Sequence, residues 1–282
     1  MKFVYLLLIS ASISLTICQK PRILQGCRRK PDILNIKITK NNVVDLTHVM
    51  DERTFVWPTA TRGYEMFTVF KGFITATVRF FLQSYSFFTP EHSGTHMDAP
   101  SHFYEDKSHT DEVGFDSIIG RGVLIDLTKN NTRYEKDGRV TIDDILAWEI
   151  IHGRMRSGSI VLLYTGYSNY YYDRPVYMGT NLTGAEGEAN LHFPGLHEET
   201  TEWLVNNRCI AAIGIDTPSM DYGQSKNYPS HRILCKSDIP IFENVANLKK
   251  LADAGRGFKV IALPLKLKGG SGSPVRIIAA LN

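Results

Sequence analysis

Residues with metal-binding side chains are concentrated in one short stretch of the sequence. The stretch holds three histidines and one aspartate around a glycine and a proline, and it reads His92-Ser93-Gly94-Thr95-His96-Met97-Asp98-Ala99-Pro100-Ser101-His102. Imidazole nitrogens together with a carboxylate oxygen suit zinc or manganese. Gly94 permits backbone angles that bulkier residues resist, and Pro100 restricts the chain that follows it. The stretch therefore predicts a rigid loop folded around a divalent metal ion.

The alternative for such a stretch is an ordinary histidine-rich surface loop, and a lone histidine is more often structural than catalytic. Four potential ligands or proton carriers so close together favour the functional interpretation. A divalent ion held there could lower the pKa of water from about 15.7 to about 7 and polarise a carbonyl group. This chemistry is typical of a hydrolase.

The elements that must position this loop are predicted from hydrophobic patterns. Apolar, β-branched runs predict strands at residues 43–46, 64–70, 75–82, 123–127, 160–165, 210–215, 259–265 and 275–281. A helix is predicted to begin after Thr141, with Asp144 as its capping partner, and apolar spacing predicts helices over 196–205 and 245–252. Strands mixed with a few helices, without strict alternation, predict one α/β domain rather than a doubly wound sheet.

Composition is that of an ordinary soluble globular protein. The chain has 282 residues, of which 43% are hydrophobic and 22% charged, so it can bury a core without help from disulfides. The formal net charge is only +3, and no stripe of basic and aromatic residues appears. We therefore expect no nucleic-acid partner, and we interpret the basic residues between Lys20 and Lys30 as a solvated tail.

The N-terminal residues have the pattern of a secretory signal peptide. Lys2 gives a positive start, residues 3–17 are almost entirely apolar or small, and Gln19 returns the chain to polar character. This apolar stretch is short for a membrane span, so we expect cleavage near Cys18 and no membrane attachment afterwards; an uncleaved anchor is the alternative. The prediction divides the chain into a signal peptide (1–18), a basic tail (19–35) and one folded domain (36–282).

Glycosylation and cysteine patterns agree with a secreted or extracellular protein. Two sequons predict N-glycosylation at Asn130 and Asn181. Removal of the signal peptide would leave Cys27, Cys209 and Cys235, and an odd number implies a free or intermolecular thiol and at most one internal bridge. A Cys209–Cys235 bridge is one pairing that the sequence leaves open.

The motif H-x-G-T-H-x-D-x-P-x-H resembles the signature of the cyclase family, which includes bacterial-type kynurenine formamidases and isatin hydrolases. Later segments at 193–196, 214–221, 239–244 and 272–276 also resemble landmarks of that family. The resemblance extends over residues 40–282. It implies a swivelling β/β/α domain, with mixed strands in a barrel-like core and helices outside. It also implies that residues 36–282 form a metal-dependent hydrolase domain and that the protein is a homodimer.

The resemblance assigns roles to six residues. His92 and His96 would bind one metal ion, Asp98 would bridge two ions, and His102 would be the catalytic proton donor and acceptor. In the two-zinc formamidases a later histidine, and a glutamate twelve residues beyond it, complete the second site. His231 and Glu243 match that spacing. Their ordinary alternatives are a surface histidine and a glutamate at a helix start.

One tryptophan is a candidate for substrate binding. Trp57 aligns loosely with a family tryptophan that contacts the aryl substrate, and a flat ring suits that role. A core tryptophan is the alternative. The family's W-P-G-D wording departs here to Trp57-Pro58-Thr59-Ala60, which leaves the identity of the substrate open.

The implied activity is hydrolysis of a carbon–nitrogen bond in a non-peptide amide, with two zinc ions as the expected cofactor. The leading substrate is N-formyl-kynurenine, an intermediate of tryptophan degradation, which would give formate and kynurenine. One alternative is a hydrolase for a cyclic amide such as isatin, with a single manganese ion. Another is a secreted binding protein that keeps the fold without turnover; the complete set of ligand positions argues against it.

Overall fold

The structure is a computed structural model that describes residues 35–130 and 136–282. The predicted signal peptide (1–18), Cys27 and all but the last residue of the predicted tail (19–35) lie outside the described residues, as does part of the sequon that begins at Asn130. Asn181 is described, and it is exposed. No helix in the described ranges is long and apolar enough to cross a membrane.

Seven strands form a closed, barrel-like mixed sheet, in the order β12-β11-β5-β7-β9-β10-β4, and β4 pairs back with β12. An additional strand, β1 (Val43–Asp45), pairs with β12. The barrel strands are β4 (His96–Asp98), β5 (Ile119–Asp126), β7 (Ile160–Tyr164), β9 (Ala212–Ile215), β10 (Ile241–Glu243), β11 (Phe258–Pro264) and β12 (Gly272–Leu281). Pairs from β5 through β7 and β9 to β10 are parallel, and the rest are antiparallel. The expected mixed, barrel-like α/β fold is confirmed.

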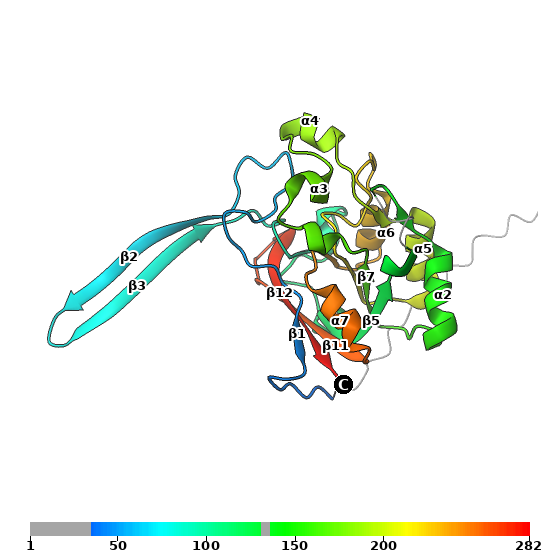
Figure 1. Ribbon diagram of the computed structural model, residues 1–282, viewed down its shortest axis with the longest axis horizontal. Coiled ribbons are helices and arrows are strands. Elements are labelled where there is room, and N and C mark those ends of the chain that lie inside the picture. The colour runs from blue at the N-terminus through cyan, green and yellow to red at the C-terminus, as the bar shows by residue number, and fades with distance from the viewer. Residues whose placement is uncertain (1–34, 131–135) are drawn as a thin grey trace, which may run out of the picture.

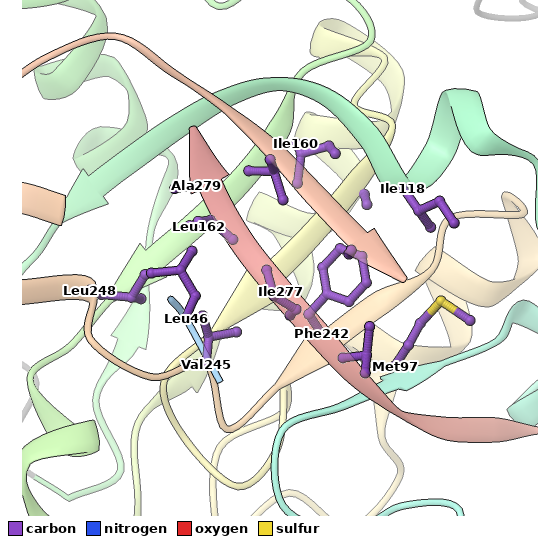
Figure 2. Close-up of a cluster of buried hydrophobic side chains, with 14 of the residues drawn as sticks. Leu46, Met97, Ile118, Ile160, Leu162, Phe242, Val245, Leu248, Ile277 and Ala279 are labelled. Carbon is purple, nitrogen blue, oxygen red and sulfur yellow. The ribbon is translucent and has the colours of Figure 1, made fainter. Parts of the chain in front are cut away.

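The core explains why the barrel strands are so apolar. Every residue of β7 is buried, because parallel strands are covered on both faces. Alternate residues of β7 serve different clusters: Ile160 and Leu162 join one that also contains Phe242 and Ile277, as Figure 2 shows. Val161 and Leu163 pack on the other face, in a cluster with side chains of α2, α5 and α6.

Helices lie around the barrel (Figure 1). They are α1 (Phe115–Ile118), α2 (Ile142–His152), α3 (Arg174–Met178), α4 (Gly184–Ala189), α5 (Glu198–Arg208), α6 (Pro229–Lys236) and α7 (Leu248–Ala254), with short 3-10 turns η1 (Pro100–His102), η2 (Thr128–Asn130) and η3 (Tyr167–Tyr170). A small parallel pair joins β6 (Arg139–Val140) to β8 (Gly195–Leu196). The predicted start of α2 is confirmed, since Thr141 and Asp144 form a capping box.

The other two predicted helices begin later than expected. Leu196 belongs to β8, where it pairs with Val140, so α5 begins at Glu198 rather than at 196. Asn247 has a left-handed φ of 56°, so α7 begins at Leu248 rather than at 245. Tertiary pairing and a local turn thus override the apolar spacing.

The structure tests the Cys209–Cys235 pairing that the sequence left open. Cys209 is disulfide-bonded. Cys235, on α6, is a free thiol that is buried in the hydrophobic cluster on that face of the sheet. A Cys209–Cys235 bridge is therefore wrong.

A long hairpin projects from the body of the molecule (Figure 1). Its strands are β2 (Glu65–Thr75) and β3 (Arg79–Phe88). The sequence predicted a strand at 64–70 and another beginning at 75, but the turn between the strands falls at 76–78 and the second strand extends to Phe88. We call these two strands the arm. Apolar side chains are exposed along it, among them Met66, Phe67, Val69, Phe73, Phe80, Phe81 and Phe87.

Candidate metal centre

The histidine-rich stretch forms a tight loop followed by strand β4. Gly94 has a φ of +56°, and a Cβ there would lie 2.9 Å from the Thr54 side chain. The Gly94 N–H donates to the Phe55 carbonyl at 2.9 Å, which ties the loop to the neighbouring segment. Only glycine fits this position comfortably, so the unusual backbone angle expected at Gly94 is confirmed.

Strand β4 directs two predicted ligands to the same side. His96 and Asp98 are two residues apart on the strand, so their side chains share a face, while Met97 points into the core. In the antiparallel pairing of β4 with β10, Glu243 lies opposite His96. The sheet therefore brings the loop near residue 95 and the segment near residue 243 together.

Helix α6 supplies the remaining histidine. Pro229 occupies the first turn, where its missing N–H costs nothing. The Asp221 carboxylate accepts from the backbone N–H groups of Ser230 and His231 at 3.0 and 3.1 Å. It also pairs with His231 Nδ1 at 2.6 Å, which leaves His231 Nε2 directed at the cluster.

Asp98 lies between His92 and His96 on one side and His231 on the other. Its Oδ1 is 2.6 Å from His92 Nδ1 and 3.2 Å from His96 Nε2. Its Oδ2 is 3.2 Å from His231 Nε2. The two oxygens of one carboxylate thus face opposite groups, which is the arrangement of a shared, bridging ligand.

Glu243 completes both groups. Its Oε2 is 3.5 Å from His96 Nε2, and its Oε1 is 3.0 Å from His231 Nε2. The Met220 N–H donates to Oε1 at 2.6 Å and fixes the carboxylate. The structure therefore brings all five predicted ligand residues together, from β4 and its preceding loop, α6 and β10.

The donor set fits a divalent metal ion. Ligand atoms of His92, His96 and Asp98 lie within 4.8 Å of one another, as do those of Asp98, His231 and Glu243. Two buried carboxylates at such short range need compensating positive charge. His96 Nδ1 is 2.9 Å from the Gly94 carbonyl, so this nitrogen carries the proton and Nε2 offers a lone pair.

Electrostatics favour the ionised form of the central carboxylate. Burial alone would raise the pKa of Asp98, but the electrostatic influence of His92 and hydrogen bonds from His231 and His92 hold it well below its usual value. Asp98 is thus suited to act as an anionic ligand.

His102 lies beside the ligand cluster rather than within it. Its ring stacks on His92, with 3.9 Å between the ring centroids, and His102 also lines the cavity. Desolvation by the surrounding protein lowers the pKa of His102 to about 4, which leaves the imidazole neutral at pH 7. A neutral imidazole has the lone pair that a proton acceptor needs, and the lowered pKa makes its protonated form a stronger acid toward a departing amine.

The cavity has a volume of about 310 Å³, within the range of small-molecule sites. The five ligand residues and His102 are among the residues that line it. The predicted substrate-contacting Trp57 also lines it, together with Phe55, Phe103 and Tyr228. Sequence reasoning did not single out the last three. Phe103 follows His102 directly, and Tyr228 precedes the first turn of α6, but only the fold turns these rings toward the cavity.

The segment at 272–276 supports the ligands from behind. A Cβ at Gly272 would lie 2.4 Å from His92 Cε1, so the imidazole packs against a bare backbone. The Ser271 hydroxyl is 3.0 Å from His92 Nε2 and donates to Glu91 at 2.7 Å. This chain of contacts fixes the ring plane of His92.

Comparisons with known proteins agree with this site. The Cyclase family model matches residues 44–222. Isatin hydrolase of Roseibium aggregatum is 31% identical over 197 residues, which are 67% of this chain and 71% of that protein. Kynurenine formamidase of Sphingopyxis alaskensis is 31% identical over 192 residues, which are 68% of this chain and 77% of that protein.

Solved structures agree as well. Isatin hydrolase A from Ralstonia solanacearum superimposes with a TM-score of 0.71 at 28% identity, over 85% of this chain and 92% of that one. An isatin hydrolase bound to the product analogue thioisatinate gives 0.72 at 28% identity, over 84% and 91% of the two chains. The family match ends before His231 and Glu243, and the fold brings these two residues to the histidine loop.

Proposed function

Because the chain belongs to the Cyclase family, we propose that it is a metal-dependent amidohydrolase that cleaves the carbon–nitrogen bond of a small aryl amide. The leading substrate is N-formyl-kynurenine, which would yield formate and kynurenine. One observation carries the proposal: the two oxygens of Asp98 face two separate groups of ligand atoms at the side of an aromatic cavity.

Two zinc ions are the proposed cofactor. His92, His96 and Asp98 would hold one ion, and Asp98, His231 and Glu243 would hold the other. Such ions, when bound, polarise the scissile carbonyl and make water more acidic.

The protein's own residues would position the substrate and move the proton. Trp57 and Phe55 form an aromatic wall for the aryl ring. The neutral His102 would take a proton from the attacking water as the oxygen–carbon bond forms. It would then give that proton to the departing amine nitrogen as the carbon–nitrogen bond breaks.

Hydrolysis of a cyclic amide is the second candidate. Its support is that the relatives named isatin hydrolase match this chain both in sequence, at 31% identity, and in structure. This candidate would use a single manganese ion and would open a ring rather than release formate.

One experiment separates the candidates. The glycosylated protein is purified, its zinc and manganese content is measured, and N-formyl-kynurenine is assayed beside isatin. Two zinc ions per chain and formate release support the formamidase. One manganese ion with turnover of isatin alone supports the cyclic amidase. A metal-replete protein that hydrolyses neither substrate favours a binding protein.

We also propose that the protein is secreted and N-glycosylated at Asn130 and Asn181. The signal-like sequence at 1–18 and the exposed position of Asn181 support this. The disulfide bond of Cys209 is in keeping with an oxidising compartment.

We propose further that the protein is a homodimer in which the arm of each copy packs on the other. Apolar side chains occupy both faces of the arm, since neighbouring Phe80 and Phe81 are 48% and 50% exposed and must point in opposite directions. A monomer would leave this large apolar surface in water.

A second copy is the occupant best suited to the arm. The root of the arm adjoins a groove of about 280 Å³ whose walls include Val49, Phe87, Leu263 and Leu265. Because this groove and the arm belong to the same chain, a two-fold axis could seat each arm in the other copy's groove. Such a self-complementary contact is what a symmetric dimer requires.

A further inference from the structure

A second hollow adjoins the catalytic cavity. It has a volume of about 260 Å³, and three residues, Trp57, Ser219 and Tyr228, line both spaces. Both spaces have aromatic walls, but the lining of the second hollow contains none of the metal ligands and adds the carboxylate of Glu188, the ammonium group of Lys226 and the hydroxyl of Ser225. A ligand that spans both would therefore need an aromatic part and a polar part.

Glu188 stands at the junction of the two spaces. Its Oε1 accepts a hydrogen bond from the Tyr228 hydroxyl at 2.6 Å and from Trp57 Nε1 at 3.4 Å. These two donors are walls of the catalytic cavity, so the carboxylate is held where the cavity opens into the second hollow. Within residues 35–130 and 136–282, no hydrogen bond to its other oxygen, Oε2, is found, so Oε2 can accept from a ligand.

Contacts of helix α4 with the Pro58 segment also fix the position of Glu188. The Gly184 N–H at the start of α4 donates to the Pro58 carbonyl at 2.8 Å, next to Trp57. A Cβ at Gly187 would lie 3.1 Å from Pro58 Cβ and 2.4 Å from the Leu182 carbonyl, so the helix packs closely there.

Lys226 lies on a loop that is held just as firmly. The Gly223 N–H donates to the Phe193 carbonyl at 2.9 Å, and Gln224 Nε2 donates to the Leu191 carbonyl at 2.6 Å. Lys226 itself is exposed, and it is one of the residues that line the hollow. One small polar space thus presents a carboxylate and an ammonium group on fixed backbones.

From this pairing we propose that the second hollow binds the zwitterionic α-amino-acid tail of an aryl formamide. Glu188 would accept from the substrate ammonium group, and Lys226 would pair with its carboxylate. This inference rests on the proposed function, because the formamide must lie at the metal centre for the tail to reach the hollow. It also separates the two candidate activities, since a cyclic amide such as isatin has no such tail.

The test compares two substrates that share the reacting group. N-formyl-kynurenine carries the tail, and N-formyl-2-aminoacetophenone lacks it. The variants are Lys226→Met and Glu188→Gln; the second keeps an acceptor for Tyr228 and Trp57 but removes the charge. Lys236→Met and Glu186→Gln, which are exposed and outside both spaces, serve as matched controls.

We expect each test variant to raise KM for the tailed substrate about tenfold, with KM for the tail-less substrate changed less than about twofold. The kcat values should stay near wild type. Calorimetric binding of kynurenine, compared with 2-aminoacetophenone, should show the same selective loss.

Two failures can be told apart. A wild-type enzyme that hydrolyses neither formamide defeats the proposed function itself. A wild-type enzyme that hydrolyses both, with variants that leave both KM values unchanged or raise them equally, overturns the tail site alone.

Discussion

Glu243 on β10 lies directly opposite His96 on β4, and its Oε2 is 3.5 Å from the His96 Nε2. The β4–β10 pairing of the barrel thus also assembles the candidate metal centre. A slip of one residue in this register would turn Glu243 to the other face of the sheet and remove it from both ligand groups. The strand register of the fold therefore determines whether the ligand residues of the site come together.

Because Asp98 lies within the ligand cluster and His102 beside it, we expect the loss of Asp98 to affect metal binding and the loss of His102 to affect turnover. Asp98→Ala should abolish metal binding, because Asp98 is the ligand that both groups share. His102→Ala should keep its metal but lose about 10²–10⁴-fold in kcat, the usual range for a general acid–base. Metal analysis and steady-state rates of the purified variants check this. A His102→Ala enzyme without metal, or an Asp98→Ala enzyme with full metal, would reverse our assignment of roles.

Asp221 should control metal affinity without being a ligand. Its carboxylate contacts His231 Nδ1 at 2.6 Å and accepts from the His231 N–H, so it sets the ring orientation. Asp221→Asn should weaken metal affinity by about 10–100-fold, as for other residues behind a metal ligand. Competition with a chelator measures this. Asp253→Asn, an exposed change on α7, is the control, and equal affinities for the two variants would argue against a supporting role.

The arm should control the oligomeric state. Phe73 and Phe81 face each other across the hairpin, with ring centroids 5.4 Å apart, and are 60% and 50% exposed. The double variant Phe73→Ser and Phe81→Ser should run as a monomer in size-exclusion chromatography with light scattering. Ile150→Ser, at an 86% exposed position on α2, should leave the dimer intact. A wild-type monomer at micromolar concentration would contradict the dimer proposal.

A buried ion pair between α2 and α5 should make stability depend on pH. Arg208 donates to both oxygens of Glu149, at 2.6 and 2.7 Å, and the hydrogen bond from Arg208 lowers the pKa of Glu149. A lowered folded-state pKa stabilises the protein above the unfolded pKa of about 4.3, and this stabilisation is lost as pH falls through the folded value.

Glu149→Gln should therefore cost about 2–4 kcal/mol at pH 7, where the charge of Arg208 is left without its partner. The gap between wild type and variant should shrink as the pH falls through the lowered folded-state pKa of Glu149, because the wild-type side chain then becomes neutral as well. Urea unfolding at several pH values measures both effects. Glu202→Gln, an exposed position on α5, is the control. Identical unfolding curves for Glu149→Gln and wild type at pH 7 would refute the prediction.

The histidine loop could be predicted from sequence because its ligand spacing is local. His92, His96 and Asp98 lie within seven residues, and the glycine between them, Gly94, indicates an unusual turn. Long apolar strands such as β7 and β12 could also be predicted, since buried parallel and central strands are continuously apolar or alternate clearly.

The rest depends on tertiary structure. Strands β4 and β10 have three residues each, which is too short for a periodic signal, yet they carry His96, Asp98 and Glu243. Helix α6 spans only eight residues and begins at a proline, so it is too short for a periodic apolar pattern to predict it. Apolar runs in the arm predicted strands, and burial is the usual outcome for such runs, but Met66 and Val69 are 55% and 64% exposed.

The central claim is that His92, His96, Asp98, His231 and Glu243 form one ionic centre. The most direct test is a crystal of the purified protein measured at the absorption edge of its metal. We predict two anomalous peaks, one on each side of the Asp98 carboxylate. A metal-replete crystal with no peak among these five side chains would contradict the account.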